Sequence, residues 1–502
     1  MDVRSILYAT FILPTIALAT CTCATIPLSK LLTDSVQCQA LTSVLGSSVV
    51  YPNSTAYECS VSSYWSQQEQ LISPSCVLSA TSAEDVSKAL RVLVPKACKF
   101  AVRSGGHGAI AGIANIQDGV TIDLSALNWT VPSADGSLVS VGPGQRWGGL
   151  YTALDTIGVS VPGGRDSPVG VGGTTLGGGF GYFATKAGFA CDSVVEYQVV
   201  LANGRIVNAT KDKEHDLWLA LKGGSNNFGI VTNFVFRTFP LGEVWGGDIY
   251  YPVSTLDQQL DAFHRFTSNP NYDVKAGLIH NFAFSPATGP MLTNQLAYAS
   301  PQENPAPFRP FTSIQPQMMA SAQVMSLGAL AAKGGSLSPN SRQQITFAVT
   351  FENDLDLLKQ VFEIWNGSTA DVAAIPSIQW TISLEPIVPA IAYQSATRGG
   401  NVLGLDVPRQ GLVLALLSAT FNHSQEYPTV SAAAERLSNN IVRAAKAAGA
   451  YNPYIDLNHA ASWQDPIASY GDGIQAFLRR TAGKYDPQGV FQRLCPGGFK
   501  VN

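Results

Sequence analysis

The sequence predicts an α+β fold in which two differently built regions follow one another. Residues 70–241 mix short apolar strand-like segments with helical segments and glycine turns, whereas residues 242–450 hold longer strand-like and helical runs in alternation. The chain has 502 residues, of which 46% are hydrophobic. It can therefore bury a large core and fill about two to four domains. The spacing of apolar residues is the local signal for each element.

The first region can be followed element by element. A strand at Cys76 precedes a helix whose start is marked by Ser82 and the acidic pair Glu84-Asp85. The run KFAVRSGG (99–106) then leads from a strand into a glycine turn. The remaining expected elements are strands at 120–132 and 138–144, a helix at 146–158, a hairpin at 195–209 that turns at Asn203-Gly204, and a helix, glycine turn and strand at 216–240.

The second region, residues 242–450, has a different pattern of expected elements. Strand-like runs such as GDIYYPV (247–253) and QQITFAVTF (343–351) alternate with helical runs such as DLDLLKQVFEIWNG (354–367). Residues 301–345 are rich in Pro, Gln and Ser, and we expect them to form a surface excursion. The tail, 451–502, is dense in aromatic residues and forms a third segment.

Composition and missing motifs exclude several classes of protein. The net charge is −4, with charged residues at 13%, so the chain lacks the basic surface of a nucleic-acid binder. It has no G-x-x-x-x-G-K-[ST] loop, no G-x-S-x-G turn, and no G-x-G-x-x-G between a strand and a helix. Its six histidines are not spaced as metal ligands and no Cys-x-x-Cys occurs, so no metal site is predicted.

The N-terminus resembles a secretory signal peptide. Arg4 precedes an apolar stretch from Ile6 to Ala19 that ends in small residues, so residues 1–19 are the expected signal and 20–69 an N-terminal extension. An N-terminal core strand is the alternative. No other apolar run reaches about 18 residues, so no membrane anchor is expected. Five Asn-x-Ser/Thr sequons favour a secreted glycoprotein: Asn53, Asn128, Asn208, Asn366 and Asn422.

The cysteines fit an oxidising compartment. Cys21 and Cys23 lie near the presumed leader. Four more are clustered and are plausible disulfide partners, with three possible pairings: Cys38, Cys59, Cys76 and Cys98. Cys191 and Cys495 are expected to be free and buried.

Two glycine-rich stretches are the strongest candidates for a ligand site. RSGGHG (103–108) offers backbone N–H groups that can hold a diphosphate. The second stretch, 162–194, concentrates glycines that permit close approach of the backbone to a ligand. Val169, Val171 and Phe180 are threaded through it, which favours a buried ligand loop over the alternatives of a flexible surface loop or tight turns.

The motifs resemble those of the berberine-bridge-enzyme-type flavin oxidoreductases, within the wider vanillyl-alcohol-oxidase or PCMH-type FAD family, and most of all its fungal members. Six segments carry the resemblance in order: FAVRSGGH (100–107), VGVGGTTLGGGFG (169–181), GFACDSVVEYQVVLANGRIV (188–207), DLWLALKGGSNNFGIVT (216–232), QDPIASYG (464–471) and YDPQGVFQRLCPGGFK (485–500). The resemblance implies a two-part FAD-binding domain, 70–241 with the returning segment 451–502. It also implies an inserted substrate domain, 242–450, built on an antiparallel sheet covered by helices.

The resemblance also implies how FAD is held. The family's R-S-G-G-H histidine is bonded through its ring to the 8-methyl carbon of FAD, and His107 stands at that position; a histidine that only hydrogen-bonds FAD is the alternative. Some members add a cysteine link, but residues 164–168 contain none, so a single covalent attachment is expected. The other expected cofactor contacts are Arg103, Ser104, Gly105, Gly106, Gly108, Val171, Gly172, Gly173, Thr174, Gly177, Gly178, Gly179, Gly229, Ile230, Val231 and Asn458.

The catalytic group is harder to assign. His459 follows Asn458 where relatives usually have tyrosine, and an imidazole titrates near neutral pH. His459 is therefore a candidate general base, with a structural histidine as the alternative reading. Tyr393 and Asp456 are further candidates for catalytic residues.

The resulting hypothesis is a secreted FAD oxidase that takes a hydride from a small molecule and passes electrons to O2, giving H2O2. The resemblance to fungal members favours a polyketide or alkaloid-type secondary-metabolite intermediate, with ring closure as a possible consequence. A carbohydrate oxidase is the alternative, and a flavin-binding cyclase or isomerase without net redox turnover represents a different class. We expect a monomer.

Overall fold

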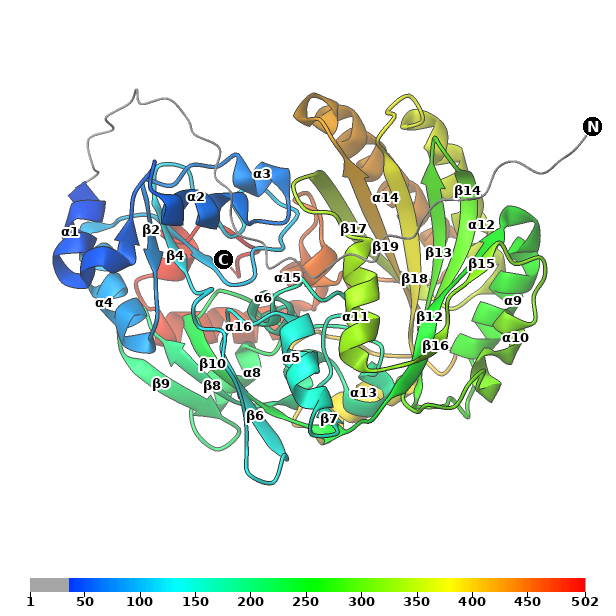
Figure 1. Ribbon diagram of the computed structural model, residues 1–502, viewed down its shortest axis with the longest axis horizontal. Coiled ribbons are helices and arrows are strands. Elements are labelled where there is room, and N and C mark those ends of the chain that lie inside the picture. The colour runs from blue at the N-terminus through cyan, green and yellow to red at the C-terminus, as the bar shows by residue number, and fades with distance from the viewer. Residues whose placement is uncertain (1–35, 502) are drawn as a thin grey trace, which may run out of the picture.

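The computed structural model describes residues 36–501, which form two lobes side by side (Figure 1). The first lobe contains the early part of the chain and its red C-terminal helices; the second contains the green-to-orange middle. The expected signal peptide, Cys21 and Cys23 lie outside the described residues. Among residues 36–501, no helix combines the length and apolarity needed to cross a bilayer.

The first lobe begins with a small sheet that leads into the RSGGHG motif. Ser82 caps the helix between β2 and β3, since its Oγ accepts a hydrogen bond from Asp85 N at 3.1 Å. Strands β2 and β3 both run parallel to β4, so the motif follows the carboxyl end of β3. The elements, with the strands in sheet order, are β1 (Val49–Val50), β2 (Cys76–Ser79), β4 (Val120–Asp123), β3 (Phe100–Arg103), α1 (Val36–Leu45), α2 (Thr55–Ser62), α3 (Gln67–Gln70) and α4 (Ala83–Leu93).

A second, antiparallel sheet completes the lobe. The predicted hairpin is confirmed: β8 and β9 pair around Asn203-Gly204, and Gly204 takes the positive φ of +78° that the turn requires. The strands, in sheet order, are β5 (Thr130–Pro132), β6 (Leu138–Val141), β10 (Ile230–Arg237), β8 (Val194–Val200) and β9 (Ile206–Thr210). The connections contain α5 (Trp147–Asp155), β7 (Val159–Ser160), α6 (Val171–Leu176), α7 (Ala184–Ala187), α8 (His215–Ala220) and β11 (Phe239–Pro240).

The second lobe is one large sheet, nine-stranded within residues 36–501, whose named pairings are antiparallel. Its strands are β15 (Met319–Ala320), β12 (Val244–Pro252), β14 (Gly289–Tyr298), β13 (Ala276–Ser285), β18 (Gln379–Ile387), β19 (Leu412–Phe421), β17 (Gln343–Glu352) and β20 (Tyr451–Asn452), with β16 (Gln323–Met325) beside β12. One face is covered by α9 (Leu256–Thr267), α12 (Leu355–Ser368) and α14 (Tyr427–Ala447), whose apolar residues share one core with the strands. The other face looks toward the first lobe (Figure 1).

The expectation that residues 301–345 form a surface excursion is wrong for much of the segment. Phe308 and Phe311 are fully buried in the core of the second lobe. Strands β15 and β16 pair with β12, and α11 (Leu327–Ser336) packs against α5 between the lobes. Aromatic and leucine side chains scattered through the segment, such as Phe308, Phe311 and Leu330, gain free energy from burial and anchor it to the core.

The C-terminal segment returns to the first lobe. After β20 come a 3-10 turn (Leu457–His459), α15 (Pro466–Ser469), α16 (Asp472–Tyr485) and α17 (Val490–Arg493). Phe100 N donates to Leu494 O at 2.8 Å, and the Phe491 ring packs edge-on against Phe100. The last helices thus pack beside β3, the strand that precedes the RSGGHG motif.

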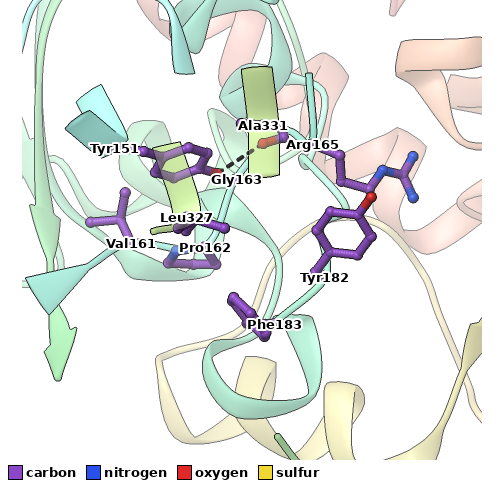
Figure 2. A pocket seen from close by; sticks show the side chains of 10 residues that line it. Tyr151, Val161, Pro162, Gly163, Arg165, Tyr182, Phe183, Leu327 and Ala331 are labelled. Carbon is purple, nitrogen blue, oxygen red and sulfur yellow. Dashed lines mark hydrogen bonds between the residues drawn. The ribbon is translucent and has the colours of Figure 1, made fainter. Parts of the chain in front are cut away.

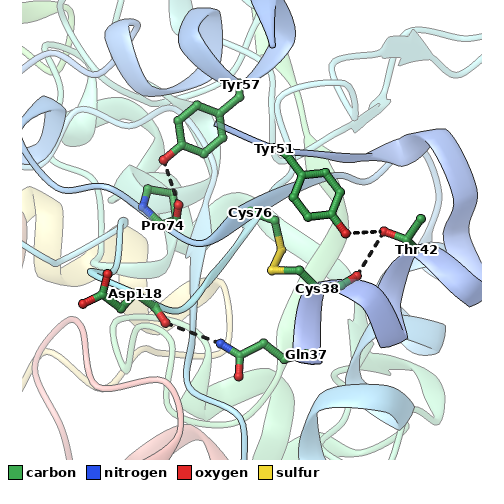
Figure 3. Close-up of a disulfide and its surroundings, with 8 residues drawn as sticks. All are labelled: Gln37, Cys38, Thr42, Tyr51, Tyr57, Pro74, Cys76 and Asp118. Atoms are coloured by element: carbon green, nitrogen blue, oxygen red, sulfur yellow. Dashed lines mark hydrogen bonds between the residues drawn. A yellow bond between two sulfur atoms is a disulfide. The ribbon is translucent and has the colours of Figure 1, made fainter. Parts of the chain in front are cut away.

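One of the possible cysteine pairings is present. Cys38 and Cys76 form a disulfide that ties α1 to β2 (Figure 3). Cys98 is buried and unbonded in the described part of the chain, so the four clustered cysteines do not form two disulfides among themselves. Cys191 and Cys495 are buried and free, as expected.

Candidate active site

The two glycine-rich stretches meet backbone against backbone. A Cβ placed on Gly105 would lie 2.4 Å from the Cα of Gly170, and the reverse holds equally. A Cβ on Gly172 would lie 2.5 Å from Ser104 Oγ. By contrast, a Cβ on Gly173 would meet nothing within 4 Å. The predicted cofactor residues of the two stretches therefore form one surface, tightly packed behind and open at Gly173.

His107 lies in this surface as a half-buried, neutral imidazole. Its ring stacks on Trp65, with ring centroids 4.2 Å apart and planes 9° from parallel. Burial, helped by the charges of Arg146 and His459, lowers the pKa of His107 to about 3. Its Nδ1 is buried without a hydrogen-bond partner. This nitrogen, in the glycine-rich loop, is available for a bond to a ligand.

The C-terminal segment brings three predicted residues to the same place. Asn458 Nδ2 donates to Thr174 O at 3.0 Å, and a Cβ on Gly177 would lie 2.3 Å from Asn458 Oδ1. His459 Nδ1 lies 2.6 Å from Asp456 Oδ2. The Asp456 side chain is only 2% exposed, whereas that of His459 is 35% exposed. His459 is thus held by a buried carboxylate and remains accessible.

A buried ion pair joins the glycine stretch to the large sheet, and the sequence motifs did not reveal it. Arg165 Nη1 lies 2.5 Å from Oε2 of Glu385, on β18. Burial raises the pKa of Asp166, against the opposing effects of Arg165 and His459. Burial also raises the pKa of Tyr182, against the opposing effect of Arg165. The available signal was a lone acid in the otherwise uncharged strand run QWTISLEPI.

Two pockets flank this ion pair. The first lies between the glycine stretch and the sheet and includes Phe180, Tyr182, Ile279 and Glu385 in its lining. The second is shown in Figure 2, where Arg165 and Tyr182 lie on the opposite side of the view from Tyr151 and Val161. The two share Arg165 and Tyr182, and neither includes His107. The ring stack on His107 and the His459–Asp456 pair therefore locate the reacting centre better than pocket volume does.

Comparison with known proteins identifies the family. The chain matches the FAD binding domain family over residues 74–210. It is 36% identical over 481 residues to the FAD-dependent monooxygenase sdcF of Emericella nidulans, an alignment that covers 93% of this chain and 98% of that protein. The chain belongs to the family of FAD-linked oxidoreductases that includes sdcF. A second relative, the FAD-dependent monooxygenase drtC of Aspergillus calidoustus, is 35% identical, covering 88% of this chain and 85% of that one.

Solved structures agree on the fold. The xylooligosaccharide oxidase of Myceliophthora thermophila superposes with a TM-score of 0.76 at 21% identity, covering 92% of this chain and 99% of the other. The BBE-like 1 protein of Physcomitrella patens also gives a TM-score of 0.76, at 19% identity, covering 93% and 100%. The expected fold, an FAD-binding lobe with an antiparallel, helix-covered sheet, is confirmed.

The residues of this FAD-linked oxidoreductase fit the cofactor. The unpartnered Nδ1 of His107 and the open space at Gly173 both belong to the surface formed by the two glycine stretches, within the segment that matches the FAD binding domain family. Ile230 and Val231 pair with β8 on one side, while β6 pairs with β10 only from Phe234 onward. The backbone of Ile230 and Val231, two of the predicted cofactor residues, is therefore paired with β8 on one side and not with β6 on the other.

Two predicted site residues sit differently from expectation. The guanidinium of Arg103 is turned away into the N-terminal segment, where it bonds Ser63 Oγ at 2.7 Å and pairs with Asp123 at 3.5 Å. Arg103 therefore supports the loop from behind. Tyr393 lies on α13 (Pro389–Thr397) with 68% of its surface exposed, and no contact joins it to the His459–Asp456 pair in the described part of the chain. Within residues 36–501, no group of three or more potential metal ligands gathers.

Proposed function

We propose that this oxidoreductase is an oxidase of an organic small molecule, with His459 as general base. FAD supplies the two-electron chemistry by accepting a hydride. Overall, the substrate loses a hydride and a proton, and O2 takes up both and leaves as H2O2. The observation that carries the proposal is the pair of His459 Nδ1 with buried Asp456 at 2.6 Å. This contact fixes the ring and leaves Nε2 to receive the substrate proton.

The substrate class is inferred from the resemblance to fungal members of the family. The relatives sdcF and drtC are fungal FAD-dependent monooxygenases. We therefore infer a polyketide or alkaloid-type secondary-metabolite intermediate rather than a carbohydrate. A panel of both classes, assayed for flavin bleaching and peroxide release, separates the two, and turnover without bleaching would indicate an isomerase or cyclase.

The names of the relatives support a second candidate, a monooxygenase. Such a reaction would place one atom of O2 in the product and reduce the other to water, at the expense of two electrons from an external reductant. Turnover under ¹⁸O2 distinguishes the outcomes. The oxidase predicts one H2O2 per product molecule and no label in the product. Labelled product without stoichiometric peroxide would replace the oxidase with the monooxygenase.

We also propose that FAD is attached covalently, once, through His107. Attachment replaces one hydrogen of the flavin 8-methyl group by an imidazole nitrogen, and the two electrons and two protons released pass to O2. The neutral ring and its unpartnered Nδ1 support this step. Acid precipitation should leave the yellow colour in the wild-type pellet and release it from His107→Ala. Colour released from both proteins would leave a flavoprotein without the covalent link.

Secretion and glycosylation remain proposals that rest on the sequence. Asn53 and Asn128 are exposed in this structure, and Asn53 sits in a turn with a φ of +71°. These two sequons are the expected sites of N-glycans on a secreted, monomeric protein. Endoglycosidase treatment of secreted protein, with peptide mapping, should find modified Asn53 and Asn128; absence of glycan from both would remove the expectation.

A further inference from the structure

A short segment of the N-terminal extension, residues 64–70, lies between the His107 loop and the second lobe. On one side it brackets His107: Trp65 N donates to Gly106 O at 2.9 Å, and Ser66 Oγ donates to Gly108 O at 2.8 Å. The Trp65 ring covers the imidazole between these two bonds. Trp65 is 9% exposed, so the stack is shielded from water.

The segment continues to hold the loop beyond His107. Gln68 Nε2 donates to Ala109 O at 2.6 Å. The carboxylate of Glu69 accepts hydrogen bonds from Gly112 N at 3.1 Å and Ala114 N at 2.7 Å. Both Ser66 and Glu69 are fully buried. The loop from 106 to 114 is therefore held along its length by consecutive residues of one segment.

The opposite side of the segment contacts the second lobe where β17 begins. Ser341 N donates to Trp65 O and Gln67 N donates to Arg342 O, both at 2.8 Å. Gln68 Nε2 also donates to Gln344 O at 2.6 Å. The same short segment thus bonds the His107 loop and the edge of the substrate sheet.

We propose that Trp65 is the positioning residue that fixes the imidazole of His107 for attachment to the flavin, and that segment 64–70 ties this loop to the substrate lobe. The inference rests on the proposed covalent attachment. A parallel stack restricts rotation of the imidazole, which leaves Nδ1 in one direction. The backbone bonds at Gly106 and Gly108 fix the position of the ring, and the stack fixes its plane.

The test compares Trp65→Leu and Trp65→Phe with wild type and with the control Trp129→Leu. Trp129 bonds Asn233 through Nε1 at 3.0 Å on the neighbouring sheet and has no contact with His107. Each holoenzyme is assayed for total flavin, and for the acid-stable fraction during incubation with added FAD. Losing the stack should slow attachment about three- to tenfold in Trp65→Leu, and less in Trp65→Phe, which keeps a flat ring. Total bound flavin should change far less, and the control should attach flavin at the wild-type rate.

A second measurement separates this inference from the attachment itself. Hydrogen–deuterium exchange of peptides covering 103–115 and 341–344 should rise in Trp65→Leu and not in Trp129→Leu. If the wild type holds FAD but never covalently, the attachment proposal fails, and exchange alone decides whether the segment positions the loop. If Trp65→Leu attaches flavin at the wild-type rate and exchanges like the wild type, Trp65 has no positioning role. Equally slow attachment in Trp65→Leu and in the control Trp129→Leu would also overturn the assignment, because it would report a general loss of stability.

Discussion

The two lobes pack their chains in opposite ways. In the first lobe, the backbone approaches itself where side chains are missing, as at Gly105 against Gly170. In the second lobe, side chains make the contacts between strands: Ser383 Oγ donates to Asn281 Oδ1 at 2.6 Å, and Asn281 Nδ2 donates to Thr293 Oγ1 at 2.8 Å. This ladder shares the face of Glu385, since β18 side chains alternate. We therefore expect substitutions in the first lobe to reduce the amount of bound flavin, and substitutions in the second lobe to change KM for the substrate.

The largest effect is expected where two backbones meet. Gly170→Ala places a methyl group 2.4 Å from the Cα of Gly105, which no side-chain movement can relieve. Overpacking of this kind costs about 1–3 kcal/mol or more and shifts the backbone. We expect a lower melting temperature and loss of most bound flavin, measured by thermal unfolding and by absorbance. Gly367→Ala is the matched control, because a Cβ there meets nothing within 4 Å. Full flavin content in Gly170→Ala would refute the idea that close approach shapes the site.

The next effect concerns chemistry with the cofactor retained. His459→Gln removes the proposed base while leaving the glycine surface intact, so turnover should fall by about 10²- to 10⁴-fold. Flavin content should stay at the wild-type level. Asp456→Asn should reduce turnover as well, since the buried carboxylate orients the ring. Stopped-flow measurement of flavin bleaching reports the step directly.

Tyr393→Phe provides the comparison for His459→Gln. The exposed position of Tyr393 leads us to expect turnover near the wild-type value. If Tyr393→Phe were the slow variant and His459→Gln the fast one, the assignment of the base would be reversed. If flavin bleaching were slow in neither variant, Glu385 and Arg165 would become the next candidates for the base.

What the sequence could predict follows the same division between the lobes. Each glycine-rich stretch is visible within a short window of sequence, so the glycine surface could be predicted as a ligand site. The fold could be predicted from the family resemblance of the motifs. The Arg165–Glu385 pair and the Trp65–His107 stack join residues far apart in the chain, and no local pattern reports them. Tyr393 was a catalytic candidate, yet its helix presents it to solvent. In 301–345, composition indicated a surface segment although Phe308 and Phe311 are core residues.

A smaller effect should distinguish the two faces of the substrate sheet. Asn281→Ala removes the centre of the Thr293–Ser383 ladder and leaves polar partners unsatisfied on the face toward the flavin lobe, which costs about 1–3 kcal/mol. We expect KM to rise more than kcat falls. Asn294→Ala is the contrast, because Asn294 bonds His280 at 2.7 Å on the helix-covered face. It should lower the melting temperature with KM unchanged. Equal KM effects in both variants would show that the ladder has no special link to substrate.

The last expected effect is a change in how stability depends on pH. Burial raises the pKa of Glu69 from 4.5 to about 7, in part offset by the hydrogen bonds from Ala114 and Gly112. Because the folded state keeps this proton where the unfolded state has lost it, Glu69 favours folding below pH 4.5, and this contribution is lost as the pH rises through 7. The full change is on the order of 3 kcal/mol.

Glu69→Gln cannot ionise, so its melting temperature relative to wild type should improve from pH 5 to about pH 7 and stay level above that. Glu363→Gln, an exposed change on α12, should show no such trend. A flat difference for Glu69→Gln would mean that Glu69 is already ionised in the folded protein. Since Glu69 holds Gly112 and Ala114, a real trend would also make the His107 loop looser at alkaline pH. Hydrogen exchange of peptide 103–115 should then rise with pH in the wild type by more than the intrinsic exchange rate does. The same peptide should show no such rise in Glu69→Gln. This result would link segment 64–70 to the stability of the first lobe.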